Sequence, residues 1–240
     1  MSPSLVDVFS PVWVQEGTKT ESAGGDLVDK VGEMKIKDES PKQETLEMRQ
    51  ISSSPELVLK HPLQNSWTLW YFKNDRSQRW EDNQRQVLTV GTVEDFWALY
   101  HHVEVASLLP AGSDYSLFKE GILPDWEDRR NALGGRWIVA VDRRKRAECL
   151  DTYWLEILYL LVGETTGPLY ADQVNGAVVN VRGKGDKLAV WLADAGEEES
   201  VLYIGRMIKK KLMIEQDQTI QFSVHNEEKA RMAGIKKICI

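Results

Sequence analysis

The chain has 240 residues, and its 37 aspartates and glutamates outnumber its 30 lysines and arginines, so the net charge at pH 7 is −7. An acidic chain is a poor candidate for coating duplex nucleic acid, because that mode of binding depends on a basic surface. Its 2 cysteines cannot build a disulfide scaffold, and no apolar run reaches the ~18 residues of a membrane span. These features predict a soluble intracellular protein in which the 9 tryptophans are the unusual count.

Residues 1–60 carry a net negative charge and are broken by Ser-Pro pairs, by Gly24-Gly25 and by the run Ser52–Pro55. Their apolar residues follow no sustained helical or strand period, so a packed core is not expected there. From His61 onward the composition changes and apolar segments become regular. We therefore predict a disordered tail over residues 1–60 and one folded domain over residues 61–240.

Segments rich in aromatic and aliphatic residues predict the strands of this domain. They are Leu63–Lys73, Arg85–Val90, Arg136–Asp142, Ala177–Arg182, Leu188–Ala193 and Thr219–Val224, with Ile235–Ile240 as a weaker candidate.

Three segments predict helices. Thr92 and Asp95 have the spacing of a capping box, which starts a helix over Val93–Val103. Acidic residues at Glu197–Glu199 and basic residues at Lys209–Lys211 suit the two ends of another helix dipole. These two charge runs are better explained as helix ends than as binding patches.

The third helix, Leu150–Val162, is apolar on nearly every side and too short to cross a membrane. In a small domain with many strands, one face can pack on the sheet while the other binds a partner. The apolar stripe of the Val93–Val103 helix is also wider than one core contact needs, and Trp97 lies at its edge. The alternative that both helices are simply well buried stays open.

Two tryptophans lie in charged loops, whereas Trp67, Trp70, Trp137 and Trp154 have core-like neighbours. Trp80 and Trp126 could form two platforms for a flat ligand, since stacking a base on an aromatic ring contributes ~1–3 kcal/mol. Glu127 follows Trp126 directly. Its carboxylate only accepts hydrogen bonds, so it selects a base with two adjacent N–H donors, as guanine presents.

The segment Asn180–Lys187 predicts a glycine-containing hairpin with three cations. Arg182, Lys184 and Lys187 could bind phosphates, although a solvated turn explains such a hairpin equally well. The second basic run, Arg143–Arg146, is most simply a solvated loop, with nuclear targeting as the alternative.

Together these residues resemble the messenger-RNA cap-binding proteins of the translation initiation factor 4E family. The matching stretches are His61–Leu63 with Trp67 and Trp70, Thr92–Trp97, Asp114–Lys119, Trp126–Asp128, Gly134–Trp137, Gly176–Arg182, Lys184–Lys187 and Trp191. The resemblance implies an α+β fold, in which a curved antiparallel sheet carries three helices on its convex face.

The resemblance also implies a binding site for the 7-methylguanosine cap. Trp80 and Trp126 would sandwich the methylated base, Glu127 would pair with N1–H and the 2-amino group, and Trp191 would contact the methyl group. The cap phosphates would be held by Arg182 and Lys187, with Arg136 and Lys184 nearby. Methylation at N7 makes the base cationic, which strengthens both stacking and the pairing with the carboxylate.

On the convex face, the resemblance implies a docking site for a helical Tyr-x-x-x-x-Leu-hydrophobic motif, which initiation factor 4G and the 4E-binding repressors carry. Its residues would be His61, Pro62, Val93, Trp97, Leu155, Glu156, Leu158 and Tyr159. Tyr159 departs from the smaller aliphatic residue more common in the family. The expected partners are capped messenger RNA, factor 4G and 4E-binding proteins, around a protomer that is itself a monomer.

An enzyme acting on nucleotides is the rival class, and it would need a base, a nucleophile or a metal cluster beside the bound ring. His101 and His102 make a poor metal pair, and the basic run Arg143–Arg146 offers no acid–base pair. We therefore expect a binding protein without catalytic residues, metal or cofactor. It would start translation in the cytoplasm, with the nucleus and RNA granules as further locations; a cap-binding repressor or specialised paralogue is the alternative.

Overall fold

The computed structural model describes residues 59–75, 77, 79–226, 228, 231 and 238–240, with the side chains of Trp80 and Glu81 left out. The predicted tail lies outside this range except for Leu59 and Lys60, so its disorder stays a prediction. No helix in the described part of the chain is long and apolar enough to cross a membrane.

Eight antiparallel strands form a single curved sheet in the order β2-β1-β3-β5-β6-β4-β7-β8. The strands are β1 (Pro62–Lys73), β2 (Gln84–Thr92), β3 (Ser113–Lys119), β4 (Gly135–Asp142), β5 (Val174–Asn180), β6 (Gly185–Leu192), β7 (Gln221–Val224) and β8 (Ile238–Cys239). Six of these were predicted as strands and β8 was the weaker candidate, whereas β3 was missed. The polar residues Ser113, Ser116 and Lys119 obscured β3, although all three are buried in the sheet.

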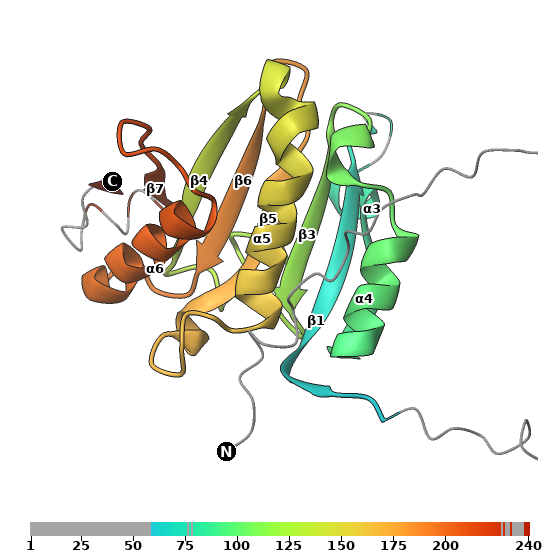
Figure 1. Ribbon diagram of the computed structural model, residues 1–240, viewed down its shortest axis with the longest axis horizontal. Coiled ribbons are helices and arrows are strands. Elements are labelled where there is room, and N and C mark those ends of the chain that lie inside the picture. The colour runs from blue at the N-terminus through green and yellow to red at the C-terminus, as the bar shows by residue number, and fades with distance from the viewer. Residues whose placement is uncertain (1–58, 76, 78, 227, 229–230, 232–237) are drawn as a thin grey trace, which may run out of the picture. The chain divides into compact units, whose positions relative to one another are not determined.

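Helices α4 (Val93–His102), α5 (Asp151–Val162) and α6 (Glu198–Lys211) cover one face of the sheet (Figure 1). The capping box is confirmed: the Asp95 N–H donates to Thr92 Oγ1 at 3.2 Å, and the Thr92 hydroxyl donates to Asp95 Oδ2 at 2.7 Å. The charge runs lie at the ends of α6, as predicted. Shorter helical turns are α3 (Trp80–Asn83), η1 (Ala106–Leu108), η2 (Arg143–Lys145), η3 (Arg146–Leu150) and η4 (Ala171–Gln173).

The main core lies between the sheet and these helices. Alternate strand residues point into it, and it also holds Trp67, Trp137 and Trp154, which are buried as predicted. Trp137 Nε1 donates to the Val201 carbonyl at 2.9 Å and so ties β4 to α6. The core prediction was wrong for Trp70, which is half-buried and lies in β1 between core residues that point the other way.

A second, smaller apolar cluster comprises Phe118, Ile122, Val178, Ala189 and Trp191. In β6, Ala189 and Trp191 alternate with Leu188, Val190 and Leu192, which belong to the main core. Because successive side chains of a strand point to opposite faces, the second cluster lies on the face without helices. This helix-free face carries Trp191, one of the residues predicted for the cap site.

Candidate functional site

Trp191 lies at the centre of a row that crosses the helix-free face. Phe118 of β3 pairs with Gly176 of β5, and Gly176 pairs with Trp191 of β6. Because Gly176 has no side chain, the rings of Phe118 and Trp191 meet edge to face with their centroids 5.4 Å apart. A Cβ at Gly176 would lie 2.4 Å from Phe118 Cγ. The glycine is therefore what lets these two rings form a continuous floor.

Arg136 continues this row on β4, directly opposite Trp191. Its guanidinium carbon lies 5.6 Å from the centroid of the Trp191 ring. Burial lowers the pKa of this arginine, and it makes no salt bridge to any side chain in the described part of the chain. A half-buried cation without a carboxylate beside it suits an anionic ligand.

His225 contacts the Trp191 ring and was missed by the sequence reasoning. The two ring centroids are 4.2 Å apart, and His225 Nδ1 lies 2.9 Å from the Asn131 carbonyl oxygen. Burial lowers the pKa of His225 to about 4, so the imidazole is neutral at pH 7 and donates its Nδ1–H to that carbonyl. A histidine just beyond the short strand β7 carries no sequence signal of such a contact.

Trp126 lies in the loop between β3 and β4, and hydrogen bonds fix the shape of this loop. The fully buried Asn131 donates to the carbonyls of Leu123 at 2.9 Å and Asp125 at 2.8 Å. The carboxylate of Asp128 accepts from the Leu123 N–H at 3.0 Å and from the Arg130 N–H at 2.8 Å.

Within that loop, Asp125 Oδ1 accepts from the backbone N–H of Glu127 at 3.0 Å. Trp126 is 50% exposed and Glu127 is exposed as well. The loop therefore presents an indole and an adjacent carboxylate to solvent on a backbone that is held in place. This is the pair that the sequence singled out for recognition of a base.

Trp80 was predicted in a polar loop, but it is the first residue of the short helix α3. The turn is held by Asn83, whose side-chain amide donates to the Asp75 carbonyl at 2.9 Å. Since the Trp80 side chain lies outside the description, its pairing with Trp126 stays a prediction.

The predicted phosphate ligands gather where β5 turns into β6. Lys187 is exposed and pairs with Asn180 of β5 and Ala140 of β4. It lies on the same face as Trp191, four residues away along β6, which corresponds to ~13 Å at ~3.3 Å per residue. Lys184 is exposed at the tip of the hairpin.

Arg182 forms an ion pair across the sheet. Its guanidinium donates to both carboxylate oxygens of Asp114 in β3, and it also donates to the Ser113 carbonyl at 3.2 Å. The hydrogen bond with Asp114 raises the pKa of Arg182. These hydrogen bonds fix the position of the Arg182 side chain, and Asp114 partly balances its charge.

The expectation of a solvated loop over Arg143–Arg146 was wrong for Arg146. Its guanidinium donates to the two carboxylate oxygens of Asp186 at 2.7 and 2.8 Å and to the Arg182 carbonyl at 2.6 Å. Asp186 is fully buried and also accepts from the Arg182 N–H at 2.9 Å. Arg146 thus fastens the β5–β6 hairpin to the turn that follows β4.

The predicted partner residues lie over α4 and α5, beginning with His61. Its backbone N–H and its Nδ1 approach the Glu94 carboxylate at 2.8 and 2.6 Å, and its carbonyl accepts from the Val93 N–H at 2.9 Å. The hydrogen bond from His61 lowers the pKa of Glu94. Pro62 is exposed and Val93 is buried, so the chain entering β1 is fastened to the first turn of α4.

Trp97 is the centre of a ring cluster between α4 and α5. Its ring lies 5.8 Å from Tyr100, 5.4 Å from His101 and 5.8 Å from Tyr159. Trp97 and Tyr159 are half-buried, as are the predicted partner residues Leu155 and Glu156.

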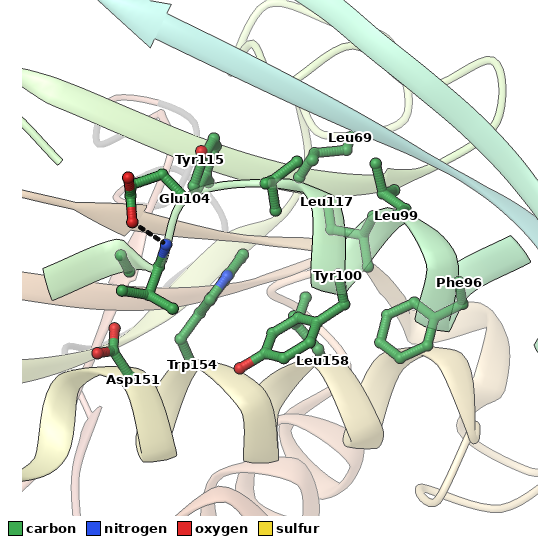
Figure 2. Close-up of a pocket in the computed structure, with 13 residues that line it drawn as sticks. Leu69, Phe96, Leu99, Tyr100, Glu104, Tyr115, Leu117, Asp151, Trp154 and Leu158 are labelled. Atoms are coloured by element: carbon green, nitrogen blue, oxygen red, sulfur yellow. Dashed lines mark hydrogen bonds between the residues drawn. The ribbon is translucent and has the colours of Figure 1, made fainter. Parts of the chain in front are cut away.

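Leu158 and Val93 differ from the other predicted partner residues because they are buried, with exposed fractions of only 4% and 8%. With Tyr100, Leu99 and Trp154, Leu158 lines a cavity of about 30 Å³ between the two helices and the sheet (Figure 2). Two residues of the predicted partner site therefore belong to the interior. The apolar side chains of α5 are thus divided between the core and the surface.

These features define a class of protein: an antiparallel sheet with helices on one face, an aromatic and basic site on the other, and a half-buried ring cluster on the helical side. The family model for eukaryotic initiation factor 4E matches residues 62–238, and the chain belongs to this family. The resemblance read from the motifs and the predicted α+β fold are both confirmed.

Solved and curated relatives agree with this assignment. The chain is 49% identical over 194 residues to translation initiation factor 4E-3 of Caenorhabditis elegans, covering 79% of this chain and 77% of the relative. It is similar to the Ascaris suum eIF4E-3 crystallised with an m2,2,7G cap, at 51% identity and a TM-score of 0.69, covering 70% of this chain and 93% of that one. It is also similar to C. elegans eIF4E-3 in complex with the 4E-binding protein Mextli and a cap analog, at 48% identity and a TM-score of 0.69, covering 76% and 100%.

Proposed function

We propose that this chain binds the 7-methylguanosine 5′ cap of messenger RNA on its helix-free face and recruits initiation factor 4G on its helical face to start translation. The observation that carries the cap assignment is the hydrogen-bonded loop that presents Trp126 beside Glu127. This pair accompanies the Trp191 floor and the cations at Arg136, Arg182, Lys184 and Lys187.

The chemistry of the bound base follows from the residues in this assignment. Trp80 and Trp126 stack on the two faces of the ring, Glu127 accepts from N1–H and the 2-amino group, and Trp191 lies against the N7 methyl group. Because methylation at N7 gives the base a positive charge, it adds a cation–π attraction of up to ~2 kcal/mol and strengthens both hydrogen bonds to the carboxylate. Methylated guanine is therefore preferred over guanine.

On the helical face, a partner helix with a Tyr-x-x-x-x-Leu-hydrophobic motif docks over Trp97, Tyr159, Leu155 and Glu156, next to His61 and Pro62. The half-buried aromatic cluster on two neighbouring helices suits helix-in-groove recognition. The complex of C. elegans eIF4E-3 with the 4E-binding protein Mextli supports a partner of this kind. A cap-binding repressor or specialised paralogue is the second candidate function, and the same observation favours it.

In this proposal the protein is a cytoplasmic binding protein and not an enzyme. The described residues contain no group of three or more His, Cys, Asp or Glu side chains arranged to hold a metal ion. The side chains that surround Trp191 are Phe118, Arg136 and His225, of which only the imidazole is a common general base. That imidazole packs against the ring of Trp191, and its Nδ1–H is already donated to the Asn131 carbonyl.

The test is retention of the full chain on immobilised 7-methylguanosine triphosphate (m7GTP), with immobilised GTP as the reference resin. We expect strong retention on the first and weak retention on the second. Glu127→Ala should abolish retention, whereas Glu120→Ala, the matched change of an exposed glutamate at the end of β3, should leave it unchanged. Equal retention on both resins would contradict the cationic-base mechanism. Identification of co-purifying proteins then distinguishes factor 4G from repressors.

A further inference from the structure

The basic run Arg143–Arg146 follows β4 directly and divides into inward and outward cations. Asp142 at the end of β4 pairs with Gly185 at the start of β6, so the run begins beside the β5–β6 hairpin. Figure 1 shows the connection from β4 to α5 at the same end of the sheet as that hairpin. Arg146 points inward to Asp186 and the Arg182 carbonyl. The run and the hairpin are therefore held together as one unit.

The charges in this unit are unevenly balanced. Arg146 is neutralised by Asp186, and Arg144 donates to both oxygens of Asp142 at 3.1 Å. The hydrogen bond from Arg144 lowers the pKa of Asp142 to about 2, so this carboxylate stays charged beside Arg144. Two of the four cations in the run are thus paired with carboxylates of their own.

The remaining cations are exposed. Arg143, Lys145 and Lys184 make no salt bridge to any side chain that the structure describes. We call Arg143 and Lys145 the rim, because Lys184 is already assigned to the cap phosphates. They adjoin Arg182 and Lys187, the residues assigned to the cap phosphates, and they stand out in a chain whose net charge is −7. This local excess of positive charge lies next to the proposed triphosphate site and could extend it to further phosphates.

We propose that the rim binds the phosphates of the first nucleotides that follow the cap in single-stranded RNA. This inference rests on the proposed cap-binding function, because the cap fixes the end of the RNA beside the rim. A chain held at its end has a high effective concentration near the rim, so a few exposed cations suffice where a free strand would need a wide basic surface. The rim reads no base and should bind any sequence.

The test compares two ligands, m7GTP and a short unstructured oligoribonucleotide that carries the same cap, each titrated into the full chain at several salt concentrations. The wild-type chain should bind the capped RNA more tightly and with a steeper salt dependence. Arg143→Gln with Lys145→Gln should weaken the capped RNA by roughly five- to tenfold at low salt and reduce its salt slope by ~1.4, at ~0.7 per phosphate contact. Its affinity for m7GTP should stay within about twofold of wild type, since neither Arg143 nor Lys145 is among the cations assigned to the cap phosphates.

The matched control is Arg206→Gln with Lys210→Gln, which removes one arginine and one lysine from exposed positions of α6 on the helical face. This variant has the same net charge as the rim variant, and it should bind both ligands like wild type. If both double variants lose the same affinity for capped RNA, or if neither does, the rim proposal is overturned. It is also overturned if the rim variant binds capped RNA like wild type and instead loses affinity for an acidic peptide titrated as a third ligand. Absence of m7GTP binding by the wild-type chain would instead overturn the proposed function and the rim with it.

Discussion

The proposed cap site and the helical face each present a partly exposed tryptophan, but they hold it by different means. Trp126 lies on a loop whose backbone is fixed by directional hydrogen bonds, which the Asn131 side chain donates and the Asp128 carboxylate accepts. Trp97 lies on a helix and is held by ring contacts with Tyr100, His101 and Tyr159. Hydrogen bonds specify one geometry, which suits a rigid planar base. Ring contacts tolerate repacking, which suits partner helices of different sequence.

If this comparison holds, the two faces can be disabled separately, and the largest effect is expected on the cap side. Trp126→Ala removes one stacking platform worth ~1–3 kcal/mol, with a cation–π contribution of up to ~2 kcal/mol. We expect the affinity for m7GTP to fall by roughly 100-fold, measured by isothermal titration calorimetry. Binding of a Tyr-x-x-x-x-Leu peptide should not change, and loss of both ligands would show that the loop supports the whole fold.

On the helical face, Trp97→Ala should cost about 2 kcal/mol of partner affinity, as is usual for an aromatic anchor at the centre of an interface. The expected loss is roughly 30-fold for a Tyr-x-x-x-x-Leu peptide, measured by fluorescence anisotropy. Affinity for m7GTP should stay at the wild-type value. A parallel drop in m7GTP affinity would instead mean that Trp97 stabilises the domain and not only its partner surface.

Mild acid should lower the stability of the folded chain through His225. The pKa of this residue is about 4 in the fold because of burial, against about 6.5 in the unfolded chain. Between these values the unfolded chain binds more protons, so the free energy of unfolding falls as the pH falls from about 6.5 to about 4. Between pH 7 and pH 5 this contribution should amount to roughly 1–2 kcal/mol in urea unfolding.

His225→Gln should remove that part of the pH dependence. The matched control is His102→Gln on the exposed side of α4, which should keep the wild-type dependence. If the wild-type chain and His225→Gln lose stability equally between pH 7 and pH 5, the buried neutral imidazole is not the cause.

The smallest expected effect concerns the cap itself. In an m2,2,7G cap, two methyl groups replace both hydrogens of the 2-amino group, so Glu127 can accept only from N1–H. Losing one hydrogen bond at an exposed carboxylate should cost about 1 kcal/mol, or roughly fivefold in affinity relative to m7GTP. The two caps are compared in competition assays on the wild-type chain. A wild-type preference for m2,2,7G would show that another contact compensates.

Much of the fold could be predicted from the sequence because it depends on local pattern. The capping box at Thr92 and Asp95, the all-round apolar helix α5 and the charge order of α6 each appeared with little change in their bounds. Strand β3 was missed because Ser113, Ser116 and Lys119 are polar yet buried. Lys119 is accommodated there by donating to the Ala171 carbonyl at 2.8 Å, a contact with a segment far along the chain.

The sequence also determined which residue types could recognise a cationic purine. Trp126 and Glu127 are adjacent in the chain, and an indole beside a carboxylate in a charged loop is visible without any structure. What only the tertiary structure decided is how the site is supported. Arg146 reaches Asp186 across 40 residues, and His225 reaches Asn131 across 94. Such partners meet only when the strands are paired, because their positions depend on sheet register and not on local sequence.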